Sequence, residues 1–296
     1  MLKKISIIDA INLLFWLVMT FFLVITFNKT PYKTELIISY PLLLIFYFYS
    51  IKIRTIKSLG KIRKVLAFLL PATFFFLIFE TLFMILPYST ETRYDTLLAQ
   101  IDLALFGISP TVWIEQYIQP IFTEILYIAY FLYFPMPLLV FGWMFYKRQY
   151  RSIEKYFFIF LLTYYSAYTC YFLFPAVGPR FFLADQYSIP LQGLYFTDFL
   201  RTFIDTLEPN KLDAFPSLHT AILITTMILA YKNSKFLFYI YIPIGILILI
   251  SVIYCRYHYF IDVIAGVVCS LISYWAAYRI YYRYRQKFSF HFGEQT

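Results

Sequence analysis

A histidine and an aspartate near the end of the chain have a spacing that suits nucleophilic chemistry. His258 precedes Asp262 by four residues at the start of an apolar run, so on a helix the two side chains would share one face. The carboxylate could accept a hydrogen bond from the imidazole, fix its tautomer and leave the other nitrogen free to attack. The alternatives are a structural pair and half of a metal site, but a metal would need a third ligand that neither motif supplies.

A second histidine lies in the segment Pro216-Ser217-Leu218-His219. Pro and Ser favour the start of a helix, and Ser is a good cap. The free N–H groups and the positive dipole end of such a start make it an anion site. His219 would stand beside that site, where it could give a proton to a leaving oxygen. An ordinary capped helix start is the alternative.

Two arginines adjoin these motifs. Arg180 follows Gly178-Pro179, and Arg256 lies two residues before His258. A guanidinium is a planar fork of donors that suits phosphate oxygens, although a single arginine at a membrane surface more often extends to the interface. Beside two histidines and a helix start, the arginines indicate a site for phosphate.

The composition shows what kind of chain must position these groups. Of the 296 residues, 61% are hydrophobic, 23% aromatic and 14% charged, whereas a soluble domain is about 25% charged. A soluble globular protein is therefore excluded. The net charge of +9 does not indicate nucleic acid, because the charges lie in short blocks between apolar runs.

The apolar runs predict about eight transmembrane helices in an all-α bundle. The first run follows Lys3 and Lys4 without a small-x-small cleavage site, so we expect it to be retained. The runs cover residues 5–27, 35–51, 65–86, 121–146, 153–174, 217–231, 236–254 and 259–279.

The basic residues predict the orientation. The termini and the even-numbered loops hold 18 of the 25 Lys and Arg residues, so the positive-inside rule places both termini in the cytoplasm. Both histidine motifs then face outward. We expect an integral membrane protein, of a bacterial inner membrane, with its site towards the periplasm or exterior.

Two long outward loops contain apolar residues at helical spacing, in 94–105 and 196–207. These stretches predict helices in the interface plane, either as structural caps or as a rim that guides a lipid to the site. Glu80 and Glu124 are the notable charges inside apolar runs. Charges at mid-membrane would favour a transporter, but both glutamates lie near outer helix ends, so we expect them to border the site or pair with loop residues.

The two histidine motifs resemble those of the type 2 phosphatidic acid phosphatase superfamily. Pro216-Ser217-Leu218-His219 is similar to its second motif, Pro-Ser-Gly-His, and His258 with Asp262 is similar to the end of its third motif, His-x-x-x-Asp. The resemblance implies a six-helix membrane core in residues 65–280, two additional helices in 1–64 and a cytoplasmic tail in 281–296.

The resemblance also implies a mechanism without a metal or other cofactor. His258 would attack phosphorus and become a phosphohistidine, Asp262 would orient it, and His219 would protonate the leaving alcohol. Ser217, Arg180 and Arg256 would hold the phosphoryl oxygens.

The chain departs from the family pattern around the arginines. The first motif, Lys, six residues, Arg-Pro, has Leu173 in place of its lysine, and the arginine of the third motif is replaced by Val252. Gly178-Pro179-Arg180 is more similar to a divergent branch that includes inositol phosphorylceramide synthase. The resemblance thus implies a lipid phosphate phosphohydrolase, or alternatively a phosphotransferase that moves a phospho-headgroup onto a lipid alcohol. A non-catalytic transporter or scaffold is the third hypothesis. The expected partners are a lipid phosphate or phospholipid substrate and membrane lipids.

Overall fold

The structure, a computed structural model, describes residues 5–207 and 211–284. These residues form thirteen α-helices and no β-strand, with one isolated parallel bridge between Ala176 and Asp213. The predicted all-α class is therefore confirmed. Of the predicted tail 281–296, residues 285–296 lie outside the described residues, and 281–284 continue the last helix.

The chain divides into two compact units. The first comprises Met1–Glu91, Met144–Tyr165 and Ser273–Thr296, and the second comprises Thr92–Trp143 and Ser166–Ile272. All candidate catalytic and phosphate-binding residues belong to the second unit.

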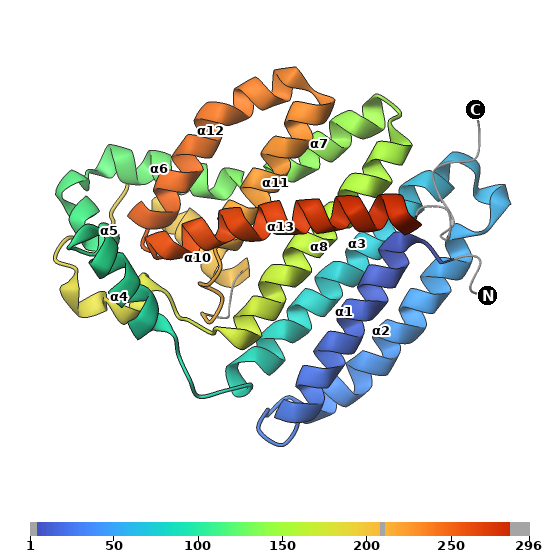
Figure 1. The fold of residues 1–296 in the computed structure, drawn as a ribbon, viewed down its shortest axis with the longest axis horizontal. Helices are drawn as coiled ribbons and strands as arrows, with labels where there is room; N and C mark the ends of the chain where they lie inside the picture. Colours follow the sequence, from blue (N-terminus) through green and yellow to red (C-terminus); the bar gives the residue numbers. More distant parts are fainter. Residues whose placement is uncertain (1–4, 208–210, 285–296) are drawn as a thin grey trace. The chain divides into compact units, whose positions relative to one another are not determined.

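In the first unit, helix α3 (Gly60–Ile85) packs against α1 (Ile7–Thr26) and α2 (Lys33–Arg54), as Figure 1 shows. Helix α1 begins where Ser6 and Asp9 form a reciprocal capping box, which satisfies two N–H groups that a helix start leaves without intrahelical partners. The unit also contains the first part of α8 (Tyr150–Leu173) and the end of α13 (Phe260–Tyr284).

A buried ion pair joins α1 to the end of α2. Arg54 Nη2 lies 2.7 Å from Asp9 Oδ1, and both side chains are fully buried. The Tyr47 hydroxyl donates to the same carboxylate oxygen at 2.8 Å. Because a buried charge is costly without such partners, this cluster fixes the pairing of the two helices.

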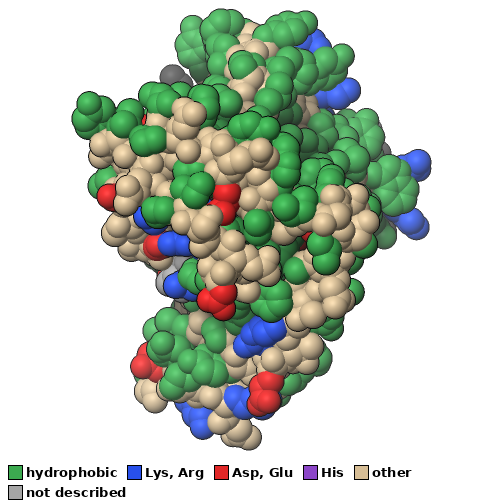
Figure 2. Space-filling view, turned by 90° about the vertical axis from the view of Figure 1, so that its left-hand side faces the viewer, with side chains coloured by type: hydrophobic (Ala, Val, Ile, Leu, Met, Phe, Trp, Pro, Cys, Tyr) green, Lys and Arg blue, Asp and Glu red, His purple; other side chains and the backbone are tan. Residues whose placement is uncertain are grey.

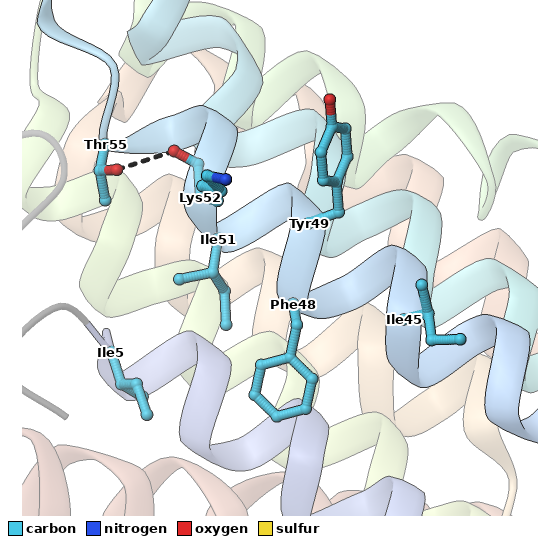
Figure 3. Close-up of a pocket in the computed structure, with 7 residues that line it drawn as sticks. All are labelled: Ile5, Ile45, Phe48, Tyr49, Ile51, Lys52 and Thr55. Carbon is cyan, nitrogen blue, oxygen red and sulfur yellow. Dashed lines mark hydrogen bonds between the residues drawn. The ribbon is translucent and has the colours of Figure 1, made fainter. Parts of the chain in front are cut away.

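A pocket of about 450 Å³ lies close to this end of the unit (Figure 3). The Thr55 hydroxyl donates to the Lys52 carbonyl at its edge. No candidate site residue lines the pocket, whose lining comprises Ile5, Ile45, Phe48, Tyr49, Ile51, Lys52 and Thr55.

In the second unit, α12 (Lys235–Tyr254) packs against α6 (Pro120–Leu132) and α11 (Leu218–Asn233), and α10 (Thr197–Leu207) packs on α6. These elements surround the histidine motifs. The unit also contains the end of α8, the start of α13 and most of α7 (Pro135–Tyr146). Its shorter elements are α4 (Asp95–Phe106), α5 (Pro110–Trp113) with the 3-10 turn η4 (Ile114–Tyr117), and α9 (Pro179–Phe182) with the 3-10 turn η5 (Ala184–Gln186).

The predicted single helix 121–146 is wrong, because the structure divides it into α6 and α7 with a bend of 43°. Pro135 begins α7, and a proline has no N–H to continue the preceding helix. The predicted helices in 94–105 and 196–207 correspond to α4 and α10.

Six helices are long and apolar enough to cross a membrane, and up to eight spans result if each bent pair counts as one. These eight are not the predicted eight. The pair Asp95–Phe106 and Pro110–Tyr117 counts among them, whereas α11 has 16 residues. At about 1.5 Å per residue that helix is shorter than the roughly 30 Å of a bilayer core.

Hydrophobic side chains cover large parts of the face drawn in Figure 2. Exposed hydrophobic side chains of the described residues include Val24 at 71% and Phe21 at 61% on α1. Such surface is expected where lipid replaces water, so the long apolar helices are those of an integral membrane protein.

Candidate active site

His258 lies in the turn between α12 and α13 rather than on a helix. The turn begins with Arg256 at a φ of 65°, and the N–H groups of Tyr257 and His258 both donate to the carbonyl of Val252. This tight turn buries His258, which is only 5% exposed. The prediction that His258 and Asp262 share a helical face is therefore wrong, because α13 begins only at Phe260.

The hydrogen bond of the His258 ring is also not the predicted one. Its Nδ1 lies 2.9 Å from the carbonyl oxygen of Ala214, but 3.5 Å from Asp262 Oδ2. A carbonyl can only accept, so Nδ1 carries the proton in this arrangement. The tautomer that leaves Nε2 with a lone pair is therefore set by a backbone group.

Asp262 occupies the first turn of α13 and is fully buried. Its Oδ2 accepts the N–H of Tyr259 at 2.8 Å. Within the described part of the chain, Oδ1 is buried and accepts no hydrogen bond. The carboxylate thus caps α13 and lies beside His258 as a nearby negative charge.

The second motif begins α11 as predicted. Ser217 is its N-cap, and its Oγ accepts the N–H of Thr220 at 3.3 Å. The backbone N–H of Ser217 donates to the carbonyl of Asp262 at 3.0 Å. A Cβ on Gly266 would come within 2.5 Å of the Ser217 carbonyl oxygen. Glycine therefore allows α13 to cross the start of α11, which brings the two motifs together.

The His219 ring is enclosed by aromatic side chains. Its centroid lies 4.2 Å from those of both Tyr130 on α6 and Tyr133, the residue that follows α6, and 5.7 Å from the centroid of His258. The Tyr130 hydroxyl lies 3.4 Å from His219 Nδ1. The structure therefore brings the two predicted histidines together, with tyrosines that sequence analysis did not single out.

Both predicted phosphate-binding arginines are paired with carboxylates. Arg180 forms two hydrogen bonds with Asp205 of α10, at 2.7 and 3.0 Å. Arg256 Nη2 lies 2.5 Å from Glu115 Oε1 and 2.6 Å from the carbonyl of Ile189. Arg256 thus holds a loop together, whereas Arg180 Nη1 also donates to the hydroxyl of Tyr257, the residue before His258, at 3.3 Å.

Two aspartates of α4 connect the first and third motifs. Asp95 accepts the N–H groups of Val177 and Gly178, at 3.0 and 2.9 Å, and the hydroxyl of Tyr259 at 3.0 Å. Asp102 accepts the first two N–H groups of α13, those of Phe260 and Ile261, at 2.7 and 2.9 Å. These residues were missed because an aspartate in a predicted interfacial helix gave no signal of a distant partner.

Two glutamates hold the long loop that precedes α10. Glu124 accepts the N–H groups of residues 194–197 and the Thr197 hydroxyl, at 2.6 to 3.3 Å. Glu115 binds Ser188 and Ile189 in the same way. The expectation that Glu124 borders the site or pairs with loop residues is confirmed for the loop, whereas Glu80 is exposed on α3.

Burial shapes the electrostatics of the turn. It lowers the pKa of His258 from 6.5 to about 4, against the hydrogen bond to Ala214 and the negative charge of Asp213, which raise it. Burial also raises the pKa of Asp213. His258 is therefore neutral at physiological pH, the state in which an imidazole is a nucleophile.

No group of three or more His, Cys, Asp or Glu side chains among the described residues could hold a metal ion. Tyr130 and Tyr133 lie against His219, the start of α11 lies beside it, and Arg180 reaches Tyr257, which precedes His258. Such an arrangement can hold and transfer an anionic group between nitrogen and oxygen.

Comparison with known proteins gives two matches. A family model described as the PAP2 superfamily matches residues 96–276. A PA-phosphatase related-family protein of Dictyostelium discoideum is 31% identical over 112 residues, which cover 37% of this chain and 20% of that protein. The chain therefore matches about a fifth of the length of this relative. No solved structure matches the chain.

Proposed function

Because the chain belongs to the PAP2 superfamily, we propose that it is a membrane phosphohydrolase that acts on lipid phosphates. The family match confirms the resemblance inferred from the histidine motifs and supports a phosphatase-like function. The observation that carries the proposal is the pairing of His258 and His219, whose ring centroids lie 5.7 Å apart in a buried site.

In the first step, the Nε2 lone pair of His258 forms a bond to phosphorus while the bond from phosphorus to the lipid oxygen breaks. His219, as an imidazolium, gives its proton to that oxygen, and the lipid leaves as an alcohol. Two buried rings this close cannot both be charged, so at most one is protonated at a time, which suits one acid and one nucleophile.

In the second step, neutral His219 takes a proton from water, and the water oxygen forms a bond to phosphorus. The N–P bond breaks, inorganic phosphate leaves, and both histidines regain their first state. Arg180 and the Ser217 hydroxyl would hold the phosphoryl oxygens, and Asp262 would stabilise the positive charge that develops on His258. Arg256 would position the turn through Glu115.

The distribution of Lys and Arg supports an outward-facing site with cytoplasmic termini. The second candidate function is phosphotransfer, in which a lipid alcohol takes the place of water. It is favoured by Leu173, which stands where the family has a lysine, and by the carboxylates that neutralise both site arginines.

The test compares detergent-solubilised wild type with His258→Ala, without added metal. The substrates are phosphatidic acid, an isoprenyl diphosphate, and a headgroup-bearing phospholipid with an alcohol acceptor. We expect release of free phosphate by the wild type only. A new phospholipid without free phosphate would establish the transferase instead.

Equal thermal midpoints of the two proteins are the control for folding. Wild-type rates in His258→Ala would overturn the proposed mechanism, since no other residue is given the nucleophile's role.

A further inference from the structure

The ion pair between Arg180 and Asp205 occupies both ends of the guanidinium fork. Nη1 and Nη2 each donate to one oxygen of the carboxylate, the geometry with which arginine would bind two phosphoryl oxygens. The Arg180 side chain is 23% exposed and that of Asp205 is 40% exposed. A phosphate that approaches Arg180 therefore meets a guanidinium whose charge is already balanced.

Asp205 is held in place by the anchoring of its helix. The N-terminus of α10 is capped by Glu124, and its buried Leu200 and Ile204 pack in one cluster with Leu126 of α6. Arg201, one turn before Asp205, donates to the Tyr127 hydroxyl at 3.3 Å. The pairing with Arg180 is therefore part of the packed structure of the unit.

The positive charges of Arg256 and Arg201 are also balanced by carboxylates. Arg256 is paired with Glu115 at 2.5 Å, and Arg201 lies 3.6 Å from Asp198. The lysine of the family's first motif is Leu173 here. Asp213 adds negative charge beside His258, and Asp262 Oδ2 lies 3.5 Å from His258 Nδ1. A further cation, Lys211, is exposed and lies over the Phe181 ring.

This charge balance distinguishes two classes of phosphate. A terminal phosphate monoester carries about two negative charges above its second pKa of about 6, whereas a phosphodiester carries one. Each additional charge that enters a partly buried site must be compensated. Because the arginines of this site are already neutralised, they compensate the second negative charge of a phosphomonoester less well.

Resting on the proposed function, we propose that Asp205 is a specificity-determining residue, which by pairing with Arg180 lowers the activity of the site towards a doubly charged phosphomonoester relative to a singly charged phosphodiester. With a diester, His258 forms the bond to phosphorus, and one ester oxygen leaves as an alcohol with the proton from His219. The phosphohistidine then carries the other ester group. Water or an alcohol, deprotonated by His219, bonds to phosphorus, the bond from phosphorus to His258 breaks, and the product leaves with that ester group.

The test measures kcat/KM for two lipids with the same acyl chains at pH 8. Dioctanoyl phosphatidic acid is the monoester, and dioctanoyl phosphatidylglycerol is the diester. In Asp205→Asn we expect the ratio of monoester to diester activity to rise about tenfold, as expected for one charge removed at roughly 6 Å in a partly solvated site. Asp185→Asn removes an exposed charge elsewhere in the same unit and should leave the ratio unchanged.

A role in positioning alone would lower both activities together and leave the ratio unchanged, which would overturn the proposal. In Arg180→Gln, a further Asp205→Asn substitution should have no effect on the ratio, because Asp205 acts through Arg180.

If neither lipid is turned over, stabilisation of the thermal midpoint by each lipid gives the same comparison. Equal responses of wild type and Asp205→Asn would then overturn it. Activity that persists in His258→Ala would instead contradict the proposed function.

Discussion

The Nδ1 atom of His258 donates to the carbonyl oxygen of Ala214, a residue 44 positions earlier in the chain. The bond is 2.9 Å long, whereas the distance from Nδ1 to Asp262 Oδ2 is 3.5 Å. The tautomer of the proposed nucleophile is thus set by the backbone next to the second motif. Asp262 is left with the roles of a helix cap and a nearby charge.

Asp262→Asn should therefore reduce activity by about 10- to 100-fold, much less than the ~10⁴-fold loss when a carboxylate alone sets the tautomer of a catalytic histidine. The amide oxygen of Asn can still accept the Tyr259 N–H, so the fold should persist. The measurement is kcat beside that of His258→Ala. Equal losses in the two variants would show that Asp262, and not Ala214, fixes the ring.

The pH profile should report the burial of His258. Burial lowers its pKa to about 4, and the nucleophile is lost when it is protonated, so activity should fall as the pH drops through about 4. We expect kcat/KM for a phosphodiester, which does not itself titrate in this range, to show no acid limb between pH 5 and 7. An inflection near 6.5, the ordinary histidine value, would contradict this.

Gly178→Ala should be costly. Gly178 has a φ of 84°, and an added Cβ would lie 2.7 Å from the carbonyl oxygen of Tyr257. The strain is about 1–3 kcal/mol, and it acts on the turn that holds His258, so activity should fall with stability. Gly142→Ala is the control, because its Cβ would meet nothing within 4 Å. A thermal midpoint of Gly178→Ala equal to that of the control would refute the expectation.

Glu124→Gln should loosen the start of α10. The carboxylate accepts from four backbone N–H groups and a hydroxyl, and an amide has a single acceptor oxygen. We expect the free energy of unfolding to fall by about 3 kcal/mol if one or two buried donors lose their partner. Limited proteolysis of the loop before α10 measures the effect, with the exposed Asp185→Asn as the matched control. Equal cleavage of both variants would contradict it.

Arg54→Met should destabilise the first unit. Removing one partner of a buried ion pair leaves Asp9 uncompensated, at a cost of about 3–5 kcal/mol. Lys52→Met, an exposed change two residues away on the same helix, should cost far less. The two thermal midpoints decide the matter, and the prediction fails if they coincide.

The sequence allowed the long apolar helices and the start of α11 at Ser217 to be predicted, because both depend on local patterns. The bend after α6 was missed because prolines inside a transmembrane run do not reliably break it. His258 was placed on a helix because a spacing of four residues cannot by itself show where that helix begins.

The residues that support the site could not be predicted, because their partners are distant in sequence. Asp102 binds the N–H of Phe260, 158 residues later, and Glu115 binds Arg256, 141 residues later. A single carboxylate gives no sign of which helix start or arginine it will meet. The predicted arginines were taken as ligands for phosphate for the same reason, since their carboxylate partners become visible only in three dimensions.

Asp95 and Asp102 are separated by seven residues, about two turns of α4. Both carboxylates therefore emerge on the same side of the helix, where one meets the loop before Arg180 and the other meets the start of α13. Helix α4 therefore sets the distance between the loop at Gly178 and the start of α13, which follows the turn of His258. One residue inserted between the two aspartates would rotate them by about 100° relative to each other. The hydrogen bonds to the loop and to the start of α13 could then no longer form together.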